Sequence, residues 1–377
     1  MIYREFQGKK LSALGFGAMR LPVKDGNDGK IDEEAALNMV DTAMKNGINY
    51  YDTAWGYHDG TSELVMGKAL SRYPRESFCL ATKFPGYDSA NWGSVEEIFE
   101  RQLEKLGVDY FDFYLFHNVC EMNIDAYLDD GKYGIYTYLM KQKQNGRIRH
   151  LGFSCHGNMD VLKRFLDAYG KDMEFCQLQL NYLDWSFQNG KEKVKLLDEL
   201  NIPVWVMEPL RGGKLASPAP EYEKQLKAIY PDEDMAALAF RFLQSIPSVK
   251  VILSGMSDKE QLEKNLETFS EDKKLSDAQL TALLDVADKM LSAGTVPCTA
   301  CHYCVSHCPQ GLDIPHLIAL YNEHAYTGGG FIAPMALSAL PEDKLPQACL
   351  KCRSCERVCP QQIKISEVLQ DFSALLG

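Results

Sequence analysis

The stretch YYDTAWGYHDGTSE, residues 50–63, carries the signals of a strand, a loop and a helix in succession. Its first residues end an apolar, β-prone run, so Asp52 stands where a strand would stop. Tyr57 follows five residues later, ahead of the turn-forming HDG sequence at 58–60, and a helical run begins soon after. Taken alone, the stretch also fits an aspartate that caps a turn and a tyrosine at the surface.

Two later apolar runs end in the same way. Residues 78–82 (FCLAT) are followed by Lys83, and residues 111–116 (FDFYLF) are followed by His117. Charged side chains at such positions are costly to bury without partners. Consecutive strands of a parallel barrel deliver their C-terminal ends to one face. We therefore expect Asp52, Lys83 and His117 to converge at the mouth of a barrel.

The order D-T-A-x-x-Y, G-x-S-E, T-K and L-x-H along the chain resembles the aldo/keto reductases. The residues that match the catalytic positions of this family are Asp52, Tyr57, Lys83 and His117. The resemblance implies a (β/α)8 TIM barrel, classed as an α/β fold. It also implies an oxidoreductase that reduces a small-molecule carbonyl, or a related unsaturated group, with NADPH or NADH.

Carbonyl reduction needs hydride at carbon and a proton at oxygen, and the resemblance makes Tyr57 the proton donor. An unperturbed tyrosine has a pKa of about 10. We expect the Lys83 cation to lower the pKa of Tyr57 by stabilising the phenolate. Asp52 would keep Lys83 charged and oriented, and His117 would hydrogen-bond the substrate oxygen.

Length and charge narrow the class of protein. The 377 residues suffice for a large barrel and a small second domain. The net charge of -12 argues against a nucleic-acid partner, because phosphate binding depends on clustered Lys and Arg. No uninterrupted apolar stretch is long enough to span a bilayer, so we expect no membrane partner. No charged-then-apolar leader follows Met1, which makes the cytoplasm the expected location.

Short β-prone runs alternate with helical stretches through eight rounds, which is the count of a TIM barrel. The expected strands lie near 13–17, 48–51, 78–82, 111–116, 148–153, 175–179, 203–207 and 249–253. The expected helices lie near 33–46, 62–71, 94–106, 135–145, 158–169, 190–200, 233–245 and 258–268. A hairpin over residues 2–11 precedes them. We predict that residues 1–293 form the barrel.

Local signals predict several boundaries. Ser94 with Glu97 has the spacing of a capping box, and Ser276 is expected to cap a further helix. The segment 117–134 is too long for an ordinary connection, so we expect it at the rim of the substrate pocket. Residues 294–297 (GTVP) are expected to form the hinge to the second domain.

Twelve cysteines without a secretory leader do not suggest disulfides. Eight form two runs with the spacing C-x2-C-x2-C-x3-C-P, namely Cys298, Cys301, Cys304 and Cys308, then Cys349, Cys352, Cys355 and Cys359. The other four, Cys79, Cys120, Cys155 and Cys176, lie among apolar neighbours and are expected in the core. Structural zinc is the alternative for the runs, but it usually takes two C-x2-C pairs without a trailing Cys-Pro.

The double run resembles two-cluster bacterial-type ferredoxins. It implies two 4Fe–4S clusters in a mostly helical ferredoxin-like domain, residues 294–377. In that pattern the fourth cysteine of each run ligates the other cluster. One cluster is therefore expected on Cys298, Cys301, Cys304 and Cys359, and the other on Cys349, Cys352, Cys355 and Cys308. The long insert between Cys308 and Cys349 departs from the compact ferredoxin pattern.

The aldo/keto reductase resemblance also assigns contacts to the nicotinamide cofactor. These residues are Met19, Ser154, Gln177, Glu208, Leu210, Gly212, Lys214, Gly255, Gln261 and Asn265. Met207 stands where the family commonly has an aromatic residue that stacks on the nicotinamide ring. Residues 254–257 and Gln261 offer no basic side chain to a 2′-phosphate, so the preference between NADPH and NADH stays open.

Three functions from different classes fit the sequence. The first is nicotinamide-dependent carbonyl reduction, with the clusters as an electron relay. In the second, the clusters feed single electrons from a ferredoxin or flavodoxin-type partner to the barrel mouth. The third is a non-catalytic barrel, against which the intact four-residue constellation argues. Hydride carries two electrons and a cluster passes one, so direct exchange needs a flavin or a substrate radical. No flavin motif is recognisable, although barrels can bind one through phosphate-gripping loops.

Overall fold

The computed structural model describes residues 1–376. The chain divides into two compact units, Met1–Val286 and Ala287–Gly377. The division falls inside helix α13 (Asp277–Gly294), whereas the sequence indicated a boundary after residue 293. The buried residues Val286, Ala287 and Met290 keep the helical apolar period going across the division. The helix therefore continues up to the expected hinge and includes Gly294.

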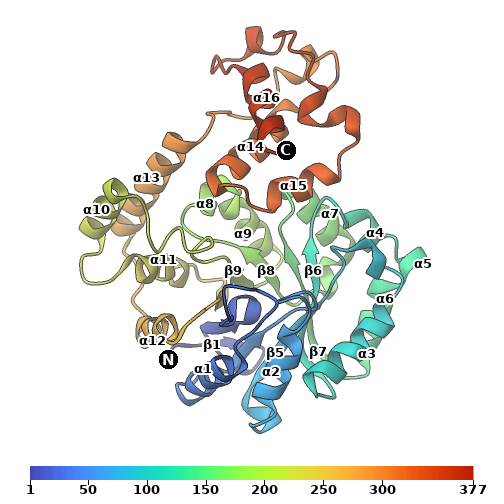
Figure 1. Ribbon diagram of the computed structural model, residues 1–377, viewed down its shortest axis with the longest axis vertical. Coiled ribbons are helices and arrows are strands. Elements are labelled where there is room, and N and C mark those ends of the chain that lie inside the picture. The colour runs from blue at the N-terminus through green and yellow to red at the C-terminus, as the bar shows by residue number, and fades with distance from the viewer. Residues whose placement is uncertain (377) are drawn as a thin grey trace. The chain divides into compact units, whose positions relative to one another are not determined.

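Eight parallel strands close into a barrel, as predicted, and their order is β10-β3-β4-β5-β6-β7-β8-β9. The strands are β3 (Leu14–Gly17), β4 (Tyr50–Asp52), β5 (Cys79–Phe84), β6 (Phe111–Val119), β7 (Ile148–Cys155), β8 (Cys176–Gln179), β9 (Val204–Met207) and β10 (Val249–Ser254). Figure 1 shows the barrel strands with helices around them, which is the TIM-barrel arrangement.

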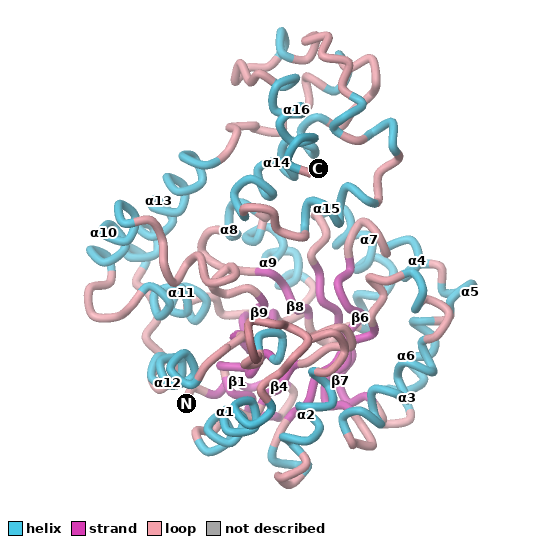
Figure 2. Tube along the Cα trace, in the orientation of Figure 1, coloured by secondary structure: helices cyan, strands magenta, loops and turns pink. Residues whose placement is uncertain are grey.

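The helices of the first unit cover the outside of the barrel (Figure 2). They are α1 (Glu33–Lys45), α2 (Ser62–Leu70), α3 (Val95–Leu106), α4 (Ile124–Leu128), α5 (Asp130–Tyr133), α6 (Ile135–Gln144), α7 (Met159–Tyr169), α8 (Asp184–Phe187), α9 (Gly190–Glu199), α10 (Pro220–Ile229), α11 (Met235–Gln244) and α12 (Lys259–Thr268). Helix α3 shows why they do so, because its buried Phe99, Leu103 and Leu106 recur at helical spacing.

The predicted hairpin forms the antiparallel pair β1 (Tyr3–Phe6) and β2 (Lys9–Ser12). Its Phe6 ring meets the Trp205 ring of β9 edge-on at 4.9 Å, with an angle of 83° between the planes. Phe6 and Leu11 belong to one buried cluster with side chains of the barrel interior. The hairpin therefore adds apolar side chains to the barrel core, in addition to its own pairing.

One of the two predicted helix caps is wrong. Ser94 stands at the N-cap of α3, but its hydroxyl makes no capping bond, and its ψ of 27° departs from the extended backbone that such a bond requires. Ser276 does cap α13, because its hydroxyl accepts from the Gln279 N–H at 3.3 Å. The Gln279 side chain reciprocates by accepting from the Ser276 N–H at 3.0 Å.

The segment after His117 is not an extended loop. Strand β6 continues to Val119, and the short helices α4 and α5 follow. Asn123 organises this turn, since its side-chain amide donates to the Asn118 carbonyl at 2.8 Å.

The second unit is mostly helical, as predicted. Its helices are α14 (Ile314–Thr327), α15 (Ile332–Ser338) and α16 (Ile365–Leu375). They enclose a separate core that includes Leu317, Ile318, Leu369 and Phe372. The cysteine runs lie in the loops that precede α14 and α16. Within residues 1–376, no helix is both long and apolar enough to cross a membrane.

Candidate active site

Lys83 lies at the centre of the barrel-mouth site. Its ammonium donates to Asp52 Oδ1 at 2.6 Å and to the Thr53 carbonyl at 2.8 Å. The Tyr57 hydroxyl lies 3.4 Å from the same nitrogen. Lys83 is fully buried and Asp52 is 2% exposed, so the ion pair is shielded from water. Three of the four predicted catalytic side chains are therefore in direct contact.

The strand register explains this convergence. Strands β4 and β5 pair with Asp52 opposite Ala81, which brings Lys83, two residues further along β5, past the end of β4. Strand β5 then pairs with β6 so that Lys83 lies opposite Leu115. Two residues after Leu115, His117 lies in an irregularity where the β6–β7 register shifts. Each functional side chain thus comes from the C-terminal end of its strand or just beyond.

His117 completes the constellation through its ring. The ring lies 6.1 Å from the Tyr57 ring and 5.2 Å from the Tyr87 ring, edge-on to both. Its Nδ1 atom is buried and has no hydrogen-bond partner in the described structure. Burial, with Lys83 and His156 nearby, holds the pKa of His117 well below its ordinary value. The imidazole is therefore neutral at physiological pH.

The electrostatics of the tyrosine differ from the sequence expectation. Burial raises the pKa of Tyr57 above its ordinary value, although Lys83 lowers it, and the burial effect is larger. Burial also lowers the pKa of Lys83, but Asp52 and Tyr57 raise it, and its pKa lies above the ordinary value. The site therefore holds a cationic lysine beside a protonated phenol.

A buried polar network lies behind the site. Glu63 is fully buried and accepts from the Thr82 hydroxyl and the Gln102 amide, each at 2.7 Å. Lys105 neutralises it from 2.7 Å. Gln102 also donates to the Lys83 carbonyl at 3.0 Å, so the network holds the backbone of β5 where Lys83 departs from it.

A cleft of about 610 Å³ opens at the barrel mouth, and Asp52 and Tyr57 are among its lining residues. Eight residues of the predicted cofactor set also line it: Met19, Gln177, Glu208, Leu210, Gly212, Gly255, Gln261 and Asn265. Met207 also lines the cleft, at the position where the family commonly has an aromatic residue.

Two predicted cofactor residues lie outside the lining of the cleft. The Ser154 hydroxyl is 1% exposed and accepts from the Asn118 N–H at 2.7 Å, so it supports the backbone beside His117. Lys214 is exposed on the loop after β9.

The cleft also has basic side chains that sequence reasoning missed. Arg20 and Lys264 both line it, and Lys264 pairs with Glu260 at 2.8 Å. Arg20 lies against Gly255, where a Cβ atom would come within 2.8 Å of the arginine Cγ. Lys264 follows Gln261 by three residues, which places both side chains on one face of a helix, so the sequence could have indicated Lys264 as a cleft residue. Arg20 directly follows Met19, which the family resemblance had assigned to the cofactor, and this adjacency was a signal for it as well.

A buried ion pair anchors the loop that follows β9. Arg211 Nε lies 3.2 Å from Asp184 Oδ1, and the arginine guanidinium packs 5.1 Å from the centre of the Phe187 ring. Asp184 Oδ2 also accepts from Asn181 at 2.6 Å, and Asn181 donates to the Glu208 carbonyl at 3.0 Å. The positive φ of 48° at Arg211 is strained, so these contacts fix an unusual backbone.

The cleft fits a nicotinamide cofactor in its polar groups. Gln177 Oε1 is buried without a hydrogen-bond partner, and a primary amide could donate to it. Gly212 and Gly213 adopt positive φ angles of 63° and 91°, and a Cβ on either would meet nothing within 4 Å. The Gly212 N–H donates to Glu208 Oε2 at 2.7 Å, so the Glu208 carboxylate holds this glycine-rich loop in place.

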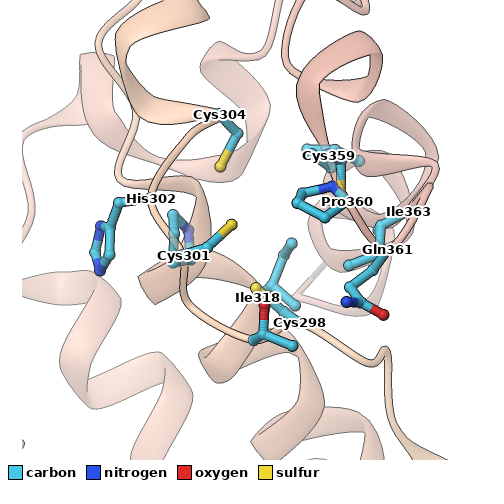
Figure 3. A pocket seen from close by; sticks show the side chains of 12 residues that line it. Cys298, Cys301, His302, Cys304, Ile318, Cys359, Pro360, Gln361 and Ile363 are labelled. Atoms are coloured by element: carbon cyan, nitrogen blue, oxygen red, sulfur yellow. The ribbon is translucent and has the colours of Figure 1, made fainter.

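The cysteine loops fit iron–sulfur clusters. Cys298, Cys301 and Cys304 from the first run line one pocket together with Cys359 from the second (Figure 3). This is one of the two crossed quartets that the sequence indicated. Among residues 1–376, no group of three or more His, Cys, Asp or Glu is arranged for a single metal ion. Four thiols around one shared space match the ligand set of a 4Fe–4S cluster.

Fold and cysteine loops together define a NAD(P)H-dependent oxidoreductase with an iron–sulfur domain. The chain belongs to the aldo/keto reductase family, whose model matches residues 13–288. Residues 297–364 match the 4Fe-4S dicluster domain.

Individual relatives match the barrel over most of their own length. The NADH-specific methylglyoxal reductase of Escherichia coli is 25% identical over 323 residues, or 74% of this chain and 96% of that protein. The L-galactose dehydrogenase of Arabidopsis thaliana is 26% identical over 284 residues, or 70% of this chain and 86% of that protein. An aldo-keto reductase of Bacillus halodurans, in its holo form, has a TM-score of 0.62 and 26% identity, covering 76% of this chain and 96% of that one.

Proposed function

We propose that this enzyme reduces the carbonyl group of a small aldehyde or ketone, with NADH or NADPH as the hydride donor and Tyr57 as the proton donor. The observation that carries the proposal is the contact of Lys83 with both Asp52 and Tyr57 beside the cleft. When bound, the nicotinamide supplies hydride to the carbonyl carbon. The protein must then supply a proton to the carbonyl oxygen.

Each catalytic side chain has a separate task in this proposal. Tyr57 holds the proton, because its raised pKa keeps the phenol protonated at neutral pH. As the proton moves toward substrate, the phenolate that develops is stabilised by the Lys83 ammonium 3.4 Å away. Asp52 keeps that ammonium charged and pointed at the phenol. The neutral imidazole of His117 donates a hydrogen bond to the substrate oxygen.

The remaining cleft residues bind the cofactor. Gln177 would accept from the nicotinamide amide, and Met207 would contact the ring in place of an aromatic side chain. The loop from Glu208 to Gly213 would hold the pyrophosphate, and Asn265 would hold the adenine. Ser154 holds the backbone beside His117 and supports the nicotinamide site from behind.

The structure of the adenosine end supports NADH as readily as NADPH. At the family's usual phosphate-binding positions, the Ser257 N–H donates to the Gln261 side chain, and Gln261 in turn donates to Asp258. Arg20 and Lys264 supply the positive charge that a 2′-phosphate would need. The NADH-specific relative favours NADH, and its substrate, methylglyoxal, represents the class of small carbonyl compound proposed here.

We further propose that two 4Fe–4S clusters act as an electron relay, exchanging electrons with a ferredoxin or flavodoxin-type protein. The quartet Cys298, Cys301, Cys304 and Cys359 supports the crossed pairing, and Cys308 with Cys349, Cys352 and Cys355 completes it. A flavin at the barrel mouth is the second candidate cofactor, because it can join one-electron and two-electron steps. Replacing Cys301 and Cys352 by Ala should abolish viologen-driven activity and leave NADH-driven activity intact. Survival of both activities would refute the relay.

The experiment that tests the carbonyl reductase proposal is Tyr57→Phe. We expect methylglyoxal reduction to fall by about 10²–10⁴-fold, because the change removes only the acid. Nicotinamide binding, followed by fluorescence titration, should change little. Tyr87→Phe is the matched control, since it removes the phenol of the other tyrosine whose ring meets His117 edge-on. Turnover of Tyr57→Phe near that of the unmodified enzyme would contradict the assignment.

A further inference from the structure

The two cysteine loops are built on the same backbone. The first has positive φ at Ala300 and His302, and the second has positive φ at the corresponding Lys351 and Arg353. Short 3₁₀ turns follow at the same place, Val305–His307 in the first loop and Glu356–Val358 in the second. These loops form an internal repeat, so their side chains can be compared position by position.

The repeat differs sharply in charge. Lys351 corresponds to Ala300, Arg353 to His302, Arg357 to Ser306 and Lys364 to Asp313. The second loop therefore has cations at four positions where the first has neutral residues or an aspartate. A chain with a net charge of -12 concentrates positive charge on only one of two otherwise matching loops.

These four cations face solvent, and no close ion pair holds them among the described residues. Lys351, Arg353, Arg357 and Lys364 are all exposed. None of them forms a salt bridge among the described residues, and Arg357 makes a neutral hydrogen bond to Ser354 at 3.0 Å. Glu356, the acidic residue of this stretch, accepts from the Ser366 N–H at 2.9 Å, and Arg353 and Lys364 are near enough to help lower its pKa. One carboxylate thus offsets only part of the charge of four cations.

An exposed apolar side chain adjoins these cations in the second cysteine loop. Leu350 is 61% exposed and directly precedes Lys351. Leu350, Lys351, Arg353, Arg357 and Lys364 are called the cationic face below. Cys352 is exposed between Lys351 and Arg353, so any group that it binds lies at this face. A charged rim around an apolar contact is typical of transient protein interfaces.

We propose that the cationic face is the docking surface for an acidic one-electron carrier protein. This inference rests on the proposed relay and assigns its partner-binding end to the second cysteine loop. The excess positive charge of these exposed side chains attracts an acidic partner over roughly a Debye length and orients it before contact. Leu350 then supplies the apolar contact that remains when salt screens the charges. The position of Cys352 favours an electron carrier over other acidic proteins.

The test is binding of oxidised flavodoxin, an acidic protein, to the anaerobically purified full-length holoenzyme. Isothermal titration calorimetry measures Kd for the unmodified enzyme and for the triple variant K351E/R353E/R357E. The triple variant should bind at least about tenfold more weakly at low ionic strength. For the unmodified enzyme, Kd should rise when ionic strength goes from about 0.02 M to about 0.2 M. The triple variant should lose most of this salt dependence.

A matched control separates docking from net charge. The variant K141E/K163E/K224E changes net charge equally, at exposed lysines of the barrel unit. It should bind flavodoxin as the unmodified enzyme does. Equal weakening in both variants would overturn the proposal, and so would unchanged binding in K351E/R353E/R357E. Binding to anionic phospholipid vesicles, but not to flavodoxin, would overturn it in favour of a membrane surface.

Two control measurements show whether the variants keep their clusters and their carbonyl reductase activity. The iron content and visible absorbance of the triple variant must match those of the unmodified enzyme. If the triple variant loses iron, the binding of flavodoxin to Leu350→Asp and the salt dependence of Kd for the unmodified enzyme test the proposal instead. NADH-driven carbonyl reduction should be unchanged in every variant of the cationic face. Loss of flavodoxin docking with intact NADH activity supports this proposal alone. If Tyr57→Phe keeps full activity while flavodoxin still docks, the carbonyl reductase proposal fails and the docking surface stands.

Discussion

The ammonium of Lys83 lies 2.6 Å from Asp52 Oδ1, and both side chains are shielded from solvent. A buried ion pair of this kind is sensitive to the loss of one partner, because the remaining charge is left without compensation. Lys83 therefore affects both stability and chemistry, and these two effects can be separated.

Lys83→Met should destabilise the barrel by about 3–5 kcal/mol, because Asp52 remains buried without its cation. Carbonyl reduction should fall by about 10²–10⁴-fold. The double variant Asp52→Asn/Lys83→Met should recover much of the lost stability in urea unfolding but none of the activity. Recovery of activity in the double variant would show that Lys83 acts only through stability.

The pH profile of carbonyl reduction should be flat through the neutral range. Burial raises the pKa of Tyr57, against the lowering effect of Lys83, so the phenol keeps its proton until the pH exceeds about 10. His117 has a pKa well below its ordinary value, so it stays neutral when pH rises from about 6. We expect kcat/KM to fall only on the alkaline side. If kcat/KM reached half its maximum near neutral pH, and this pH dependence disappeared in Tyr57→Phe, the prediction would be contradicted.

The Asp184–Arg211 ion pair predicts a separate effect on cofactor binding. Asp184→Asn removes the charge that holds Arg211, which loosens the loop from Glu208 to Gly213. The Kd for NADH should rise by about tenfold, since a buried charged contact is lost. The rate of a single turnover at saturating NADH should change little. Asp198→Asn, the same change at an exposed aspartate of α9, is the control. A variant with unchanged Kd would leave this ion pair without a role in binding.

The crossed cysteine pairing predicts which thiol belongs to which cluster. Cys359→Ala should remove the cluster of the first loop, lowering iron from about eight to about four atoms per chain. Cys79→Ala, which changes a buried cysteine of the barrel, should leave the iron content unchanged. An electron paramagnetic resonance spectrum that still reports the cluster of Cys298, Cys301 and Cys304 would refute the pairing.

The features that could be predicted from the sequence are those that are local or that repeat along the chain. The alternation of apolar runs predicted the eight strands and the hairpin, and the family resemblance identified Tyr57. The convergence of Asp52, Lys83 and His117 was predicted from their positions at strand ends. Such positions are readable because parallel strands all end at one face, whatever the helices between them do.

Features that depend on distant contacts were missed. Asp184 and Arg211 meet only when the loops after β8 and β9 come together. The Ser94 capping box was wrong because spacing does not set the local ψ angle. The net pKa of Tyr57 was misjudged for a similar reason, since burial cannot be read from a motif.

The central claim is that hydride passes from the nicotinamide to the carbonyl carbon at the Tyr57 site. The most direct measurement uses NADH deuterated at C4, with the holoenzyme and methylglyoxal under anaerobic conditions, and mass spectrometry of the product. The account predicts one carbon-bound deuterium in each product molecule, and product formation that is nearly lost in Tyr57→Phe. Product that forms without deuterium, with electrons drawn through the iron–sulfur domain, would contradict it.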